Sequence, residues 1–424
     1  MSLSRRDFLK LTGGAVAVGA WGGILLPSTG AALREDPMSE TLEATGSDVG
    51  SLYPFIKSQE LRSEYLLSFL REEFTDLEAW KEQARRKVLE HLFYSPPPVD
   101  PQPEVLFQED RGDYLLERVD FNTTPDIRVP AFVLIPKQAE FPAPGIVALH
   151  DHGGFYFYGK EKLVEDRDEH PVLTQFKRTY YEGQSIAAEL ARRGYVVVVI
   201  DMFYWGDRRL IKDGDPEVWT TNRRAATEED IQAFNRRSWE NEQLVGRTLY
   251  LAGITWAGVM FWDDLRTVDY LIRRPEVDPQ RLGCVGLSVG GYRAAHLGAQ
   301  DERIRASVVC GWMTSYRPLI KNHVINTVGW TKIIPGLYPY LDLPDIVTLT
   351  APRALMCING TRDQLWPLEG VHQAFAKITQ GYTKAGVPER FRGILYDGPH
   401  EFNRAMQQEA WAWLDRWVNV GAGW

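Results

Sequence analysis

Short apolar segments alternate with helical patterns along most of this 424-residue chain. Residues Tyr195–Ile200 read Tyr-Val-Val-Val-Val-Ile, a run typical of a strand that protein covers on both faces. Further short strands are predicted at Gly145–Leu149, Arg281–Leu287, Ile304–Cys310, Ala354–Ile358 and Phe391–Tyr396. This alternation predicts an α/β fold, with a mainly parallel central sheet and helices on both faces.

Two strands are expected ahead of this alternation, at Tyr114–Phe121 and Ile127–Ile135, where Pro130 suggests an edge or a bulge. A long helical stretch is predicted between about Trp239 and Arg274. It contains fifteen uncharged residues, Thr248–Trp262. These are too few to span a bilayer, so we expect a helix covered by the core or by a cap.

The N-terminal quarter of the chain predicts a helical arm. Thr75 and Glu78 have capping-box spacing, and the helix after them is predicted to end before Pro96. We therefore expect an arm over residues 33–105 and a catalytic domain over residues 106–424. The stretch Trp312–Asp345 separates two core strands and is expected to form a cap-like insert.

The first 32 residues resemble a twin-arginine export signal. Ser4–Lys10 read Ser-Arg-Arg-Asp-Phe-Leu-Lys, and Leu11–Pro27 is an apolar stretch rich in Gly and Ala. Gly30–Ala32 offers small residues for cleavage. The resemblance implies a periplasmic or extracellular protein with no stable membrane insertion once the signal is removed. The alternative is an uncleaved membrane anchor.

Charge and cysteine content limit the function. The net charge is −9, and no basic stripe interleaves with aromatic residues, so a nucleic-acid partner is not expected. Three cysteines cannot form a disulfide framework, and all three fall within predicted strands. His150 and His152 could form a metal pair, but no third ligand has a diagnostic spacing. We expect them to shape a loop instead, and we predict no metal and no cofactor.

One motif carries specific chemistry. Gly286–Gly290 reads Gly-Leu-Ser-Val-Gly, follows the strand Arg281–Leu287 and opens a helical pattern. In a G-x-S-x-G elbow, the serine occupies a strained turn that raises its hydroxyl above the sheet, and the glycines allow close backbone approach. Ser288 is therefore the predicted nucleophile.

Two partners for Ser288 follow later in the chain. Asp363 comes after the strand Ala354–Ile358, and His400 comes after the strand Phe391–Tyr396. The carboxyl ends of parallel strands meet at one edge of a sheet, where open α/β folds bind their ligands. We therefore predict a triad of Ser288, Asp363 and His400.

With these motifs the chain resembles the α/β-hydrolase superfamily from about Leu106 to Trp417. It is most similar to the serine branch of dienelactone-hydrolase-like and acetyl-xylan-esterase-like enzymes. Leu149–Gly154, Asp201–Arg208, Ala351–Arg353 and Asn359-Gly360 carry this likeness. Dienelactone hydrolases have a cysteine at the place of Ser288. Glucuronoyl esterases have an arginine at the place of Val289, which points away from a uronic-acid substrate.

The resemblance implies a secreted serine carboxylic-ester hydrolase that forms an acyl-enzyme. His400 would deprotonate Ser288 while Asp363 orients the imidazole. One oxyanion donor would be the Val289 amide. The other would come from the loop after the strand Gly145–Leu149, at Gly153, Gly154 or Phe155.

Residues in the strand-end loops are candidates for binding a small-molecule or carbohydrate ester. They are Tyr156, Trp205, Arg208, Trp312 and Trp366. Their aromatic rings suit a sugar face, an aryl group or an alkyl group. Two alternatives stay open: a serine peptidase of the prolyl-oligopeptidase type, and a non-catalytic binding protein with the same fold.

Overall fold

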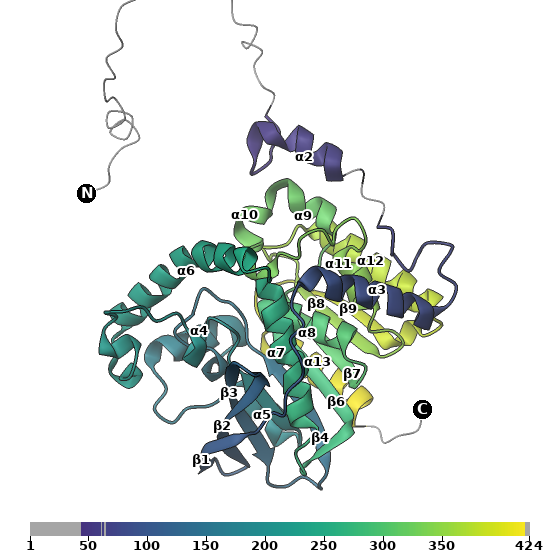
Figure 1. Cartoon of the computed structure of the whole chain (residues 1–424). Coiled ribbons are helices and arrows are strands. Elements are labelled where there is room, and N and C mark those ends of the chain that lie inside the picture. The colour runs from purple at the N-terminus through teal and green to yellow at the C-terminus, as the bar shows by residue number, and fades with distance from the viewer. Residues whose placement is uncertain (1–43, 61, 63–64, 420–424) are drawn as a thin grey trace, which may run out of the picture. The chain divides into compact units, whose positions relative to one another are not determined.

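A nine-stranded mixed sheet forms the centre of the computed structural model, which describes residues 44–60, 62 and 65–419 (Figure 1). Along the sheet the order is β1-β2-β3-β5-β4-β6-β7-β8-β9. The strands are β1 Glu104–Asp110, β2 Tyr114–Thr124, β3 Ile127–Pro136, β4 Ala143–Leu149, β5 Val196–Ile200, β6 Val277–Leu287, β7 Ile304–Cys310, β8 Ala354–Gly360 and β9 Phe391–Tyr396.

Strand direction places the functional end of the sheet. The pairs β1–β2, β2–β3 and β3–β5 are antiparallel, whereas every pair from β5 through β4 to β9 is parallel. The α/β prediction is confirmed. The loops that leave β4, β6, β7, β8 and β9 therefore emerge at one edge of the sheet.

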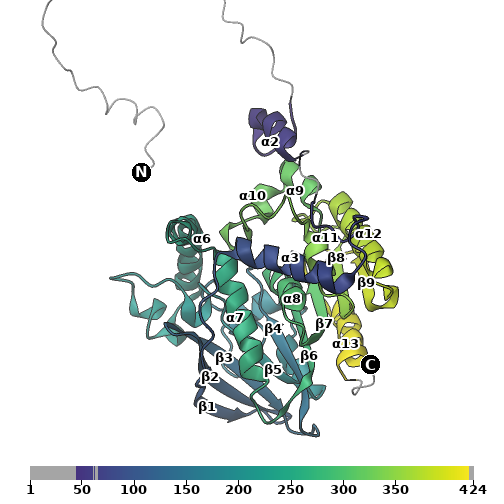
Figure 2. The same cartoon turned by 45° about the vertical axis from the view of Figure 1, so that its right-hand side comes forward.

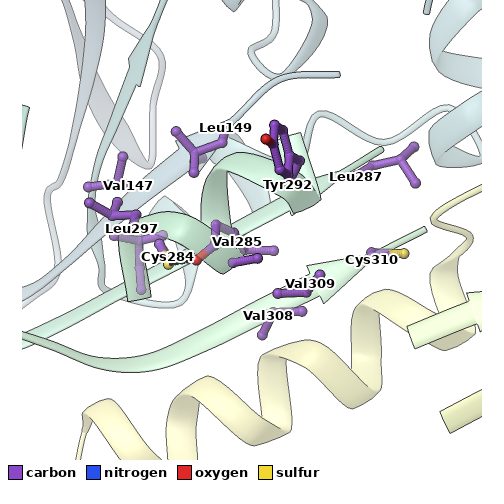
Figure 3. Close-up of a cluster of buried hydrophobic side chains, with 14 of the residues drawn as sticks. Val147, Leu149, Cys284, Val285, Leu287, Tyr292, Leu297, Val308, Val309 and Cys310 are labelled. Carbon is purple, nitrogen blue, oxygen red and sulfur yellow. Dashed lines mark hydrogen bonds between the residues drawn. The ribbon is translucent and has the colours of Figure 1, made fainter. Parts of the chain in front are cut away.

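Helices cover both faces of the sheet. They are α2 Tyr53–Glu60, α3 Leu77–Leu92, α4 Pro171–Tyr181, α5 Ile186–Arg192, α6 Glu228–Leu251, α7 Trp256–Leu271, α8 Val289–Gln300, α9 Tyr316–Asn322, α10 Val324–Thr327, α11 Leu343–Thr348, α12 Leu368–Lys384 and α13 Arg404–Val418. Helix α8 packs on β6 and β7 from one side, and α13 packs on β7 from the other (Figure 3). The strands β4, β5, β7 and β8 are consequently buried almost throughout.

A buried cluster forms where β4, β6 and β7 meet α8. Figure 3 shows Val147, Val285 and Val308 from the three strands, with Tyr292 and Leu297 from α8 above them. The cysteines Cys284, Cys310 and Cys357 are buried in β6, β7 and β8, as their strand positions predicted. Ser288 follows β6 directly, so this packed block supports its position.

Two helices of the N-terminal region lie within the described residues, α2 and α3. Helix α3 crosses α8 (Figure 2), and the Arg85 side chain donates a 2.8 Å hydrogen bond to the Ala299 carbonyl. Strand β1 begins at Glu104, so it spans the expected boundary between residues 105 and 106. The expected export signal lies outside the described residues.

The cap of α3 differs from the prediction. Asp76, one residue after Thr75, is the N-cap, and its carboxylate accepts a 3.0 Å hydrogen bond from the Ala79 amide. The capping-box interpretation of Thr75 and Glu78 was wrong because an aspartate in the next position competes for the same free amides. An ionised carboxylate also interacts favourably with the positive end of the helix.

The predicted helix from about Trp239 to Arg274 is two helices. Helix α6 ends at Leu251 and α7 begins at Trp256, and the two axes are bent by 83°. The uncharged segment Thr248–Trp262 crosses this break, and Leu251 is 91% exposed, so the segment is not one covered helix. Among the described residues no single helix is long and apolar enough to span a membrane, although this bent pair passes the same test jointly.

The stretch Trp312–Asp345 contains α9, α10 and the short 3-10 helix η6, Trp330–Lys332, and it enters α11. It packs against α6, since a Cβ atom on Gly246 would lie 2.6 Å from the Trp330 ring. The expected cap-like insert therefore packs against a second segment, the connection that leaves β5 and contains α6.

The cap of α3 gives a stability prediction. Asp76→Ala removes the acceptor of the Ala79 amide and should lower the free energy of unfolding by about 1 kcal/mol. Urea denaturation followed by circular dichroism measures this change. Thr75→Ala, which alters the exposed neighbouring residue, is the matched control and should have little effect. Equal losses for both variants would contradict the cap assignment.

Candidate active site

Ser288 occupies the sharp turn between β6 and α8. Its φ of 59° and ψ of −123° lie in a region that residues with a Cβ rarely adopt. A Cβ atom on Gly286 would lie 2.3 Å from the Gly290 carbonyl carbon, and one on Gly290 would lie 2.0 Å from the Leu149 oxygen. Only glycine fits at these two positions, so the motif forms the expected strand–turn–helix geometry.

Asp363 and His400 meet in the loops after β8 and β9. His400 Nδ1 and Asp363 Oδ2 are 2.6 Å apart. The Asp363 side chain is 1% exposed and the His400 side chain is 17% exposed. Asp363 Oδ1 also accepts the Leu365 amide at 3.0 Å. Within the described residues the hydrogen bonding of the His400 ring is through Nδ1, to Asp363.

The end of β7 joins the three loops. The Ser288 amide donates to the Cys310 carbonyl at 2.9 Å. At Gly311, where φ is 60°, a Cβ atom would lie 3.0 Å from His400 Cε1. The Trp366 indole, three residues after Asp363, donates to the Gly311 carbonyl at 2.9 Å. The structure thus brings the predicted nucleophile, base and acid to one place.

The loop after β4 contains the candidate oxyanion donors. Gly153 and Gly154 both have positive φ, 55° and 63°. The Gly154 amide donates to His152 Nδ1 at 3.0 Å, and the Phe155 amide donates to the His152 carbonyl at 3.2 Å. Within the described residues the Gly153 amide has no such partner. Val289 begins α8, where the first amides of a helix have no intrahelical acceptor.

His150 and His152 hold this loop. His150 Nδ1 contacts the Asp151 carbonyl at 2.9 Å, and His150 Nε2 accepts the Met202 amide at 3.0 Å. His152 Nε2 lies 2.7 Å from Glu242 Oε1. Burial lowers the pKa of both imidazoles, which favours their neutral forms. Both nitrogens of each ring are engaged, so neither histidine is available as a base. Among the described residues no cluster of metal-ligating side chains occurs.

The five candidate substrate residues are all largely covered by protein. Tyr156 and Trp205 are 0% exposed, and Trp312 and Trp366 are each 4% exposed. The Trp205 indole donates to the His152 carbonyl, and the Arg208 side chain pairs with Asp263 at 2.7 Å. Trp205, Trp366 and Arg208 thus bond to protein groups and hold the loops around Ser288.

Sequence reasoning missed residues of α6 that reach the site. Glu242 contacts His152, and Asn235 Oδ1 accepts the amides of Tyr156 and Phe157 at 2.9 and 3.1 Å. Trp239 is 58% exposed, and its ring lies edge-on to His152 with centroids 5.8 Å apart. The seven-residue spacing of Asn235 and Glu242 places them on one face of a helix. That spacing was the feature of the sequence that could have indicated their shared position.

Comparison with known proteins agrees with this geometry. The profile of the Abhydrolase family, Abhydrolase_7, matches residues 47–413, and the chain belongs to this family. YtaP of Bacillus subtilis (strain 168), a protein that bears the name of a hydrolase, is 28% identical over 335 residues. The match covers 79% of this chain and 99% of YtaP.

Solved structures show the same fold. A Bacteroides fragilis protein described as an acetyl xylan esterase superposes with a TM-score of 0.60 at 20% identity, over 82% of this chain and 84% of that chain. A glucuronoyl esterase of Solibacter usitatus superposes with a TM-score of 0.54 at 16% identity, over 80% and 93%. At these identities the likeness establishes the α/β-hydrolase fold.

Gly311 provides a test of how His400 is held. Gly311→Ala places a methyl group 3.0 Å from His400 Cε1 and also strains a positive φ. Displacing the imidazole should slow fluorophosphonate labelling of Ser288 by at least about 10-fold, since a 1 Å misplacement can cost ~100-fold.

Gly336→Ala is the matched control for Gly311→Ala. Gly336 has a φ of 76°, and its added methyl group would lie 3.0 Å from Cε1 of a different histidine, His91. This variant should be labelled at the wild-type rate. Wild-type labelling of Gly311→Ala would contradict the role assigned to the junction after β7.

Proposed function

We propose that the protein is a serine hydrolase of carboxylic esters that acts through an acyl-enzyme on Ser288. One observation carries the proposal. Ser288 lies on a strained strand–helix turn at one edge of the sheet. His400 lies at the same edge, and its Nδ1 is 2.6 Å from the buried Asp363 carboxylate. Serine, histidine and acid in this arrangement are the parts that nucleophilic acyl transfer requires.

The reaction proceeds in two acyl transfers. His400 Nε2 takes the Ser288 proton as Oγ attacks the ester carbonyl, and the imidazolium then protonates the leaving alcohol. Asp363 Oδ2 accepts a hydrogen bond from His400 Nδ1–H, which leaves Nε2 as the basic nitrogen and stabilises the imidazolium. Water then attacks the acyl-enzyme, with His400 again acting as base, and releases the acid and free Ser288.

The tetrahedral intermediate requires two amide donors. We assign one to Val289, the first residue of α8. Of the three candidates in the loop after β4, Gly153 is the best supported, because the Gly154 and Phe155 amides already have acceptors on His152. Losing one oxyanion donor typically costs about 10²–10³ in rate.

The substrate class follows from the walls of the site. Trp239 exposes an aromatic face beside the loop after β4, whereas Tyr156, Trp205, Trp312 and Trp366 are buried and pack against one another in pairs behind it. This surface favours acetylated carbohydrate or aryl esters. Similar folds in proteins described as acetyl xylan and glucuronoyl esterases support a carbohydrate ester.

Location is part of the same proposal. The twin-arginine motif at Ser4–Lys10 supports export to the periplasm or beyond, where polymeric carbohydrate esters are accessible. Export by this route would deliver the folded catalytic domain. A signal-dependent shift of the protein from cytoplasm to periplasm, lost on Arg5→Lys with Arg6→Lys, would support the assignment.

The nucleophile and base can be tested directly. Ser288→Ala should abolish fluorophosphonate labelling, and Ser288→Ala and His400→Ala should each lower kcat for p-nitrophenyl acetate by at least about 10³-fold. Glu401→Gln, next to the base, is the control and should keep most of the activity. Labelling that survives Ser288→Ala would exclude the proposed nucleophile.

The ester and peptidase alternatives separate by substrate. The protein should turn over p-nitrophenyl acetate and release acetate from acetylated xylan, and it should leave aminoacyl anilides intact. A series of acyl chain lengths then defines the acyl site. Cleavage of anilides at a kcat/KM comparable to that of the esters would favour a peptidase, and no turnover with an unlabelled serine would favour a binding protein.

A further inference from the structure

Helix α6 holds the loop after β4 at several points. Asn235 Oδ1 accepts two successive amides, from Tyr156 and Phe157. Two turns further along α6, Glu242 Oε1 lies 2.7 Å from His152 Nε2 and accepts the Tyr156 hydroxyl at 2.7 Å. Glu242 is 6% exposed, and so a buried carboxylate of an inserted helix contacts the proposed oxyanion loop.

The contact with Glu242 defines which nitrogen of His152 carries the proton. Nδ1 must be unprotonated to accept the Gly154 amide at 3.0 Å, so Nε2 carries the hydrogen and donates it to Glu242. Burial lowers the pKa of His152. Burial alone would raise the pKa of Glu242, but His152 and the Tyr156 hydroxyl hold it below its usual value. A neutral imidazole beside an ionised carboxylate is the state that this geometry requires.

The Gly154 amide depends on this tautomer. If His152 carried its hydrogen on Nδ1, two hydrogens would face each other and the Gly154 amide would lose its acceptor. Gly153 and Gly154 both have positive φ, which glycine adopts without strain, so hydrogen bonds and not backbone strain select this shape of the loop. Buried donors hold the other side of His152, where Lys162 Nζ and the Trp205 indole reach its carbonyl at 3.1 and 3.2 Å.

We propose that Glu242 is a positioning residue for the oxyanion loop: it holds His152 as the Nε2–H tautomer, so that His152 Nδ1 binds the Gly154 amide and the Gly153 amide stays free for the oxyanion. This inference rests on the proposed esterase function and adds a residue outside the triad. Glu242 acts through His152 and touches neither the substrate nor the reacting atoms.

Helix α6 also contacts the insert Trp312–Asp345. Helix α6 packs against η6 at Gly246 and Trp330, and Lys332 of η6 is a positive neighbour of Glu242. Burial lowers the pKa of Lys332 to about 8. Lys332 Nζ donates to the Thr327 carbonyl at 2.7 Å and so stays within the insert. The stretch Trp312–Asp345 therefore packs against α6 about one turn beyond Glu242.

The test is a double-mutant cycle with p-nitrophenyl acetate. Glu242→Leu should lower kcat and kcat/KM equally, by about 10- to 100-fold, since an interaction that serves the oxyanion acts in the transition state and not on substrate binding. Glu242→Gln keeps an acceptor oxygen and should stay within about 3-fold of wild type. Glu240→Leu, an exposed change on the same helix, is the control and should have no effect.

The decisive comparison uses His152→Asn. The Asn oxygen lies at the place of Nδ1 and can accept the Gly154 amide without a choice of tautomer. In that background Glu242→Leu should cost less than about 3-fold in kcat, so the two substitutions should be strongly non-additive. An equal loss in both backgrounds would overturn the proposal, because a general packing defect would cost the same in each.

A second pair of variants covers the case in which Glu242→Leu does not fold. His152→Phe removes the acceptor of the Gly154 amide and should lose activity as Glu242→Leu would, whereas His152→Asn should retain more. Equal activity of the two would overturn the proposal. Ser288→Ala separates the proposals: if it abolishes turnover while Glu242→Leu does not reduce it, the esterase function stands and the role of Glu242 fails.

Discussion

The site depends on the backbone junction at the end of β7. The Cys310 carbonyl holds the Ser288 amide, the missing Cβ of Gly311 makes room for the His400 ring, and the Gly311 carbonyl binds the Trp366 indole. The loops after β6, β8 and β9 thus all contact the dipeptide Cys310-Gly311. A buried strand on either side keeps that dipeptide in place, so the candidate triad is built on a buried part of the sheet.

Buried polar groups give the loop after β4 its shape. His150 and His152 each use both ring nitrogens. Their partners lie in the same loop, in the loop after β5 and in α6. A buried donor or acceptor without a partner costs about 1–3 kcal/mol, so such a loop has few alternative conformations. That restriction suits the proposed oxyanion site, in which an amide of this loop would face a transient negative charge.

Several features could be predicted from the sequence because their signals are local. The β-branched run of β5, the G-x-S-x-G turn and the strand-end positions of Asp363 and His400 each depend on a few adjacent residues. The cap of α3 was missed by one residue because Thr75 and Asp76 are both good caps and only the backbone decides between them. The break between α6 and α7 was missed because Thr248–Trp262 keeps a helical composition through a turn.

The sequence by itself determined the α/β class, the strands of the parallel sheet and the residues of the candidate triad, since periodicity and motif spacing are properties of neighbouring residues. Tertiary structure decided which amides of the loop after β4 are already bonded, that Arg208 pairs with Asp263, and that α6 brings Glu242 to His152. The last two contacts join residues that are 55 and 90 positions apart in the sequence. No local pattern encodes such pairs, because they form only when the packed sheet brings separate insertions together.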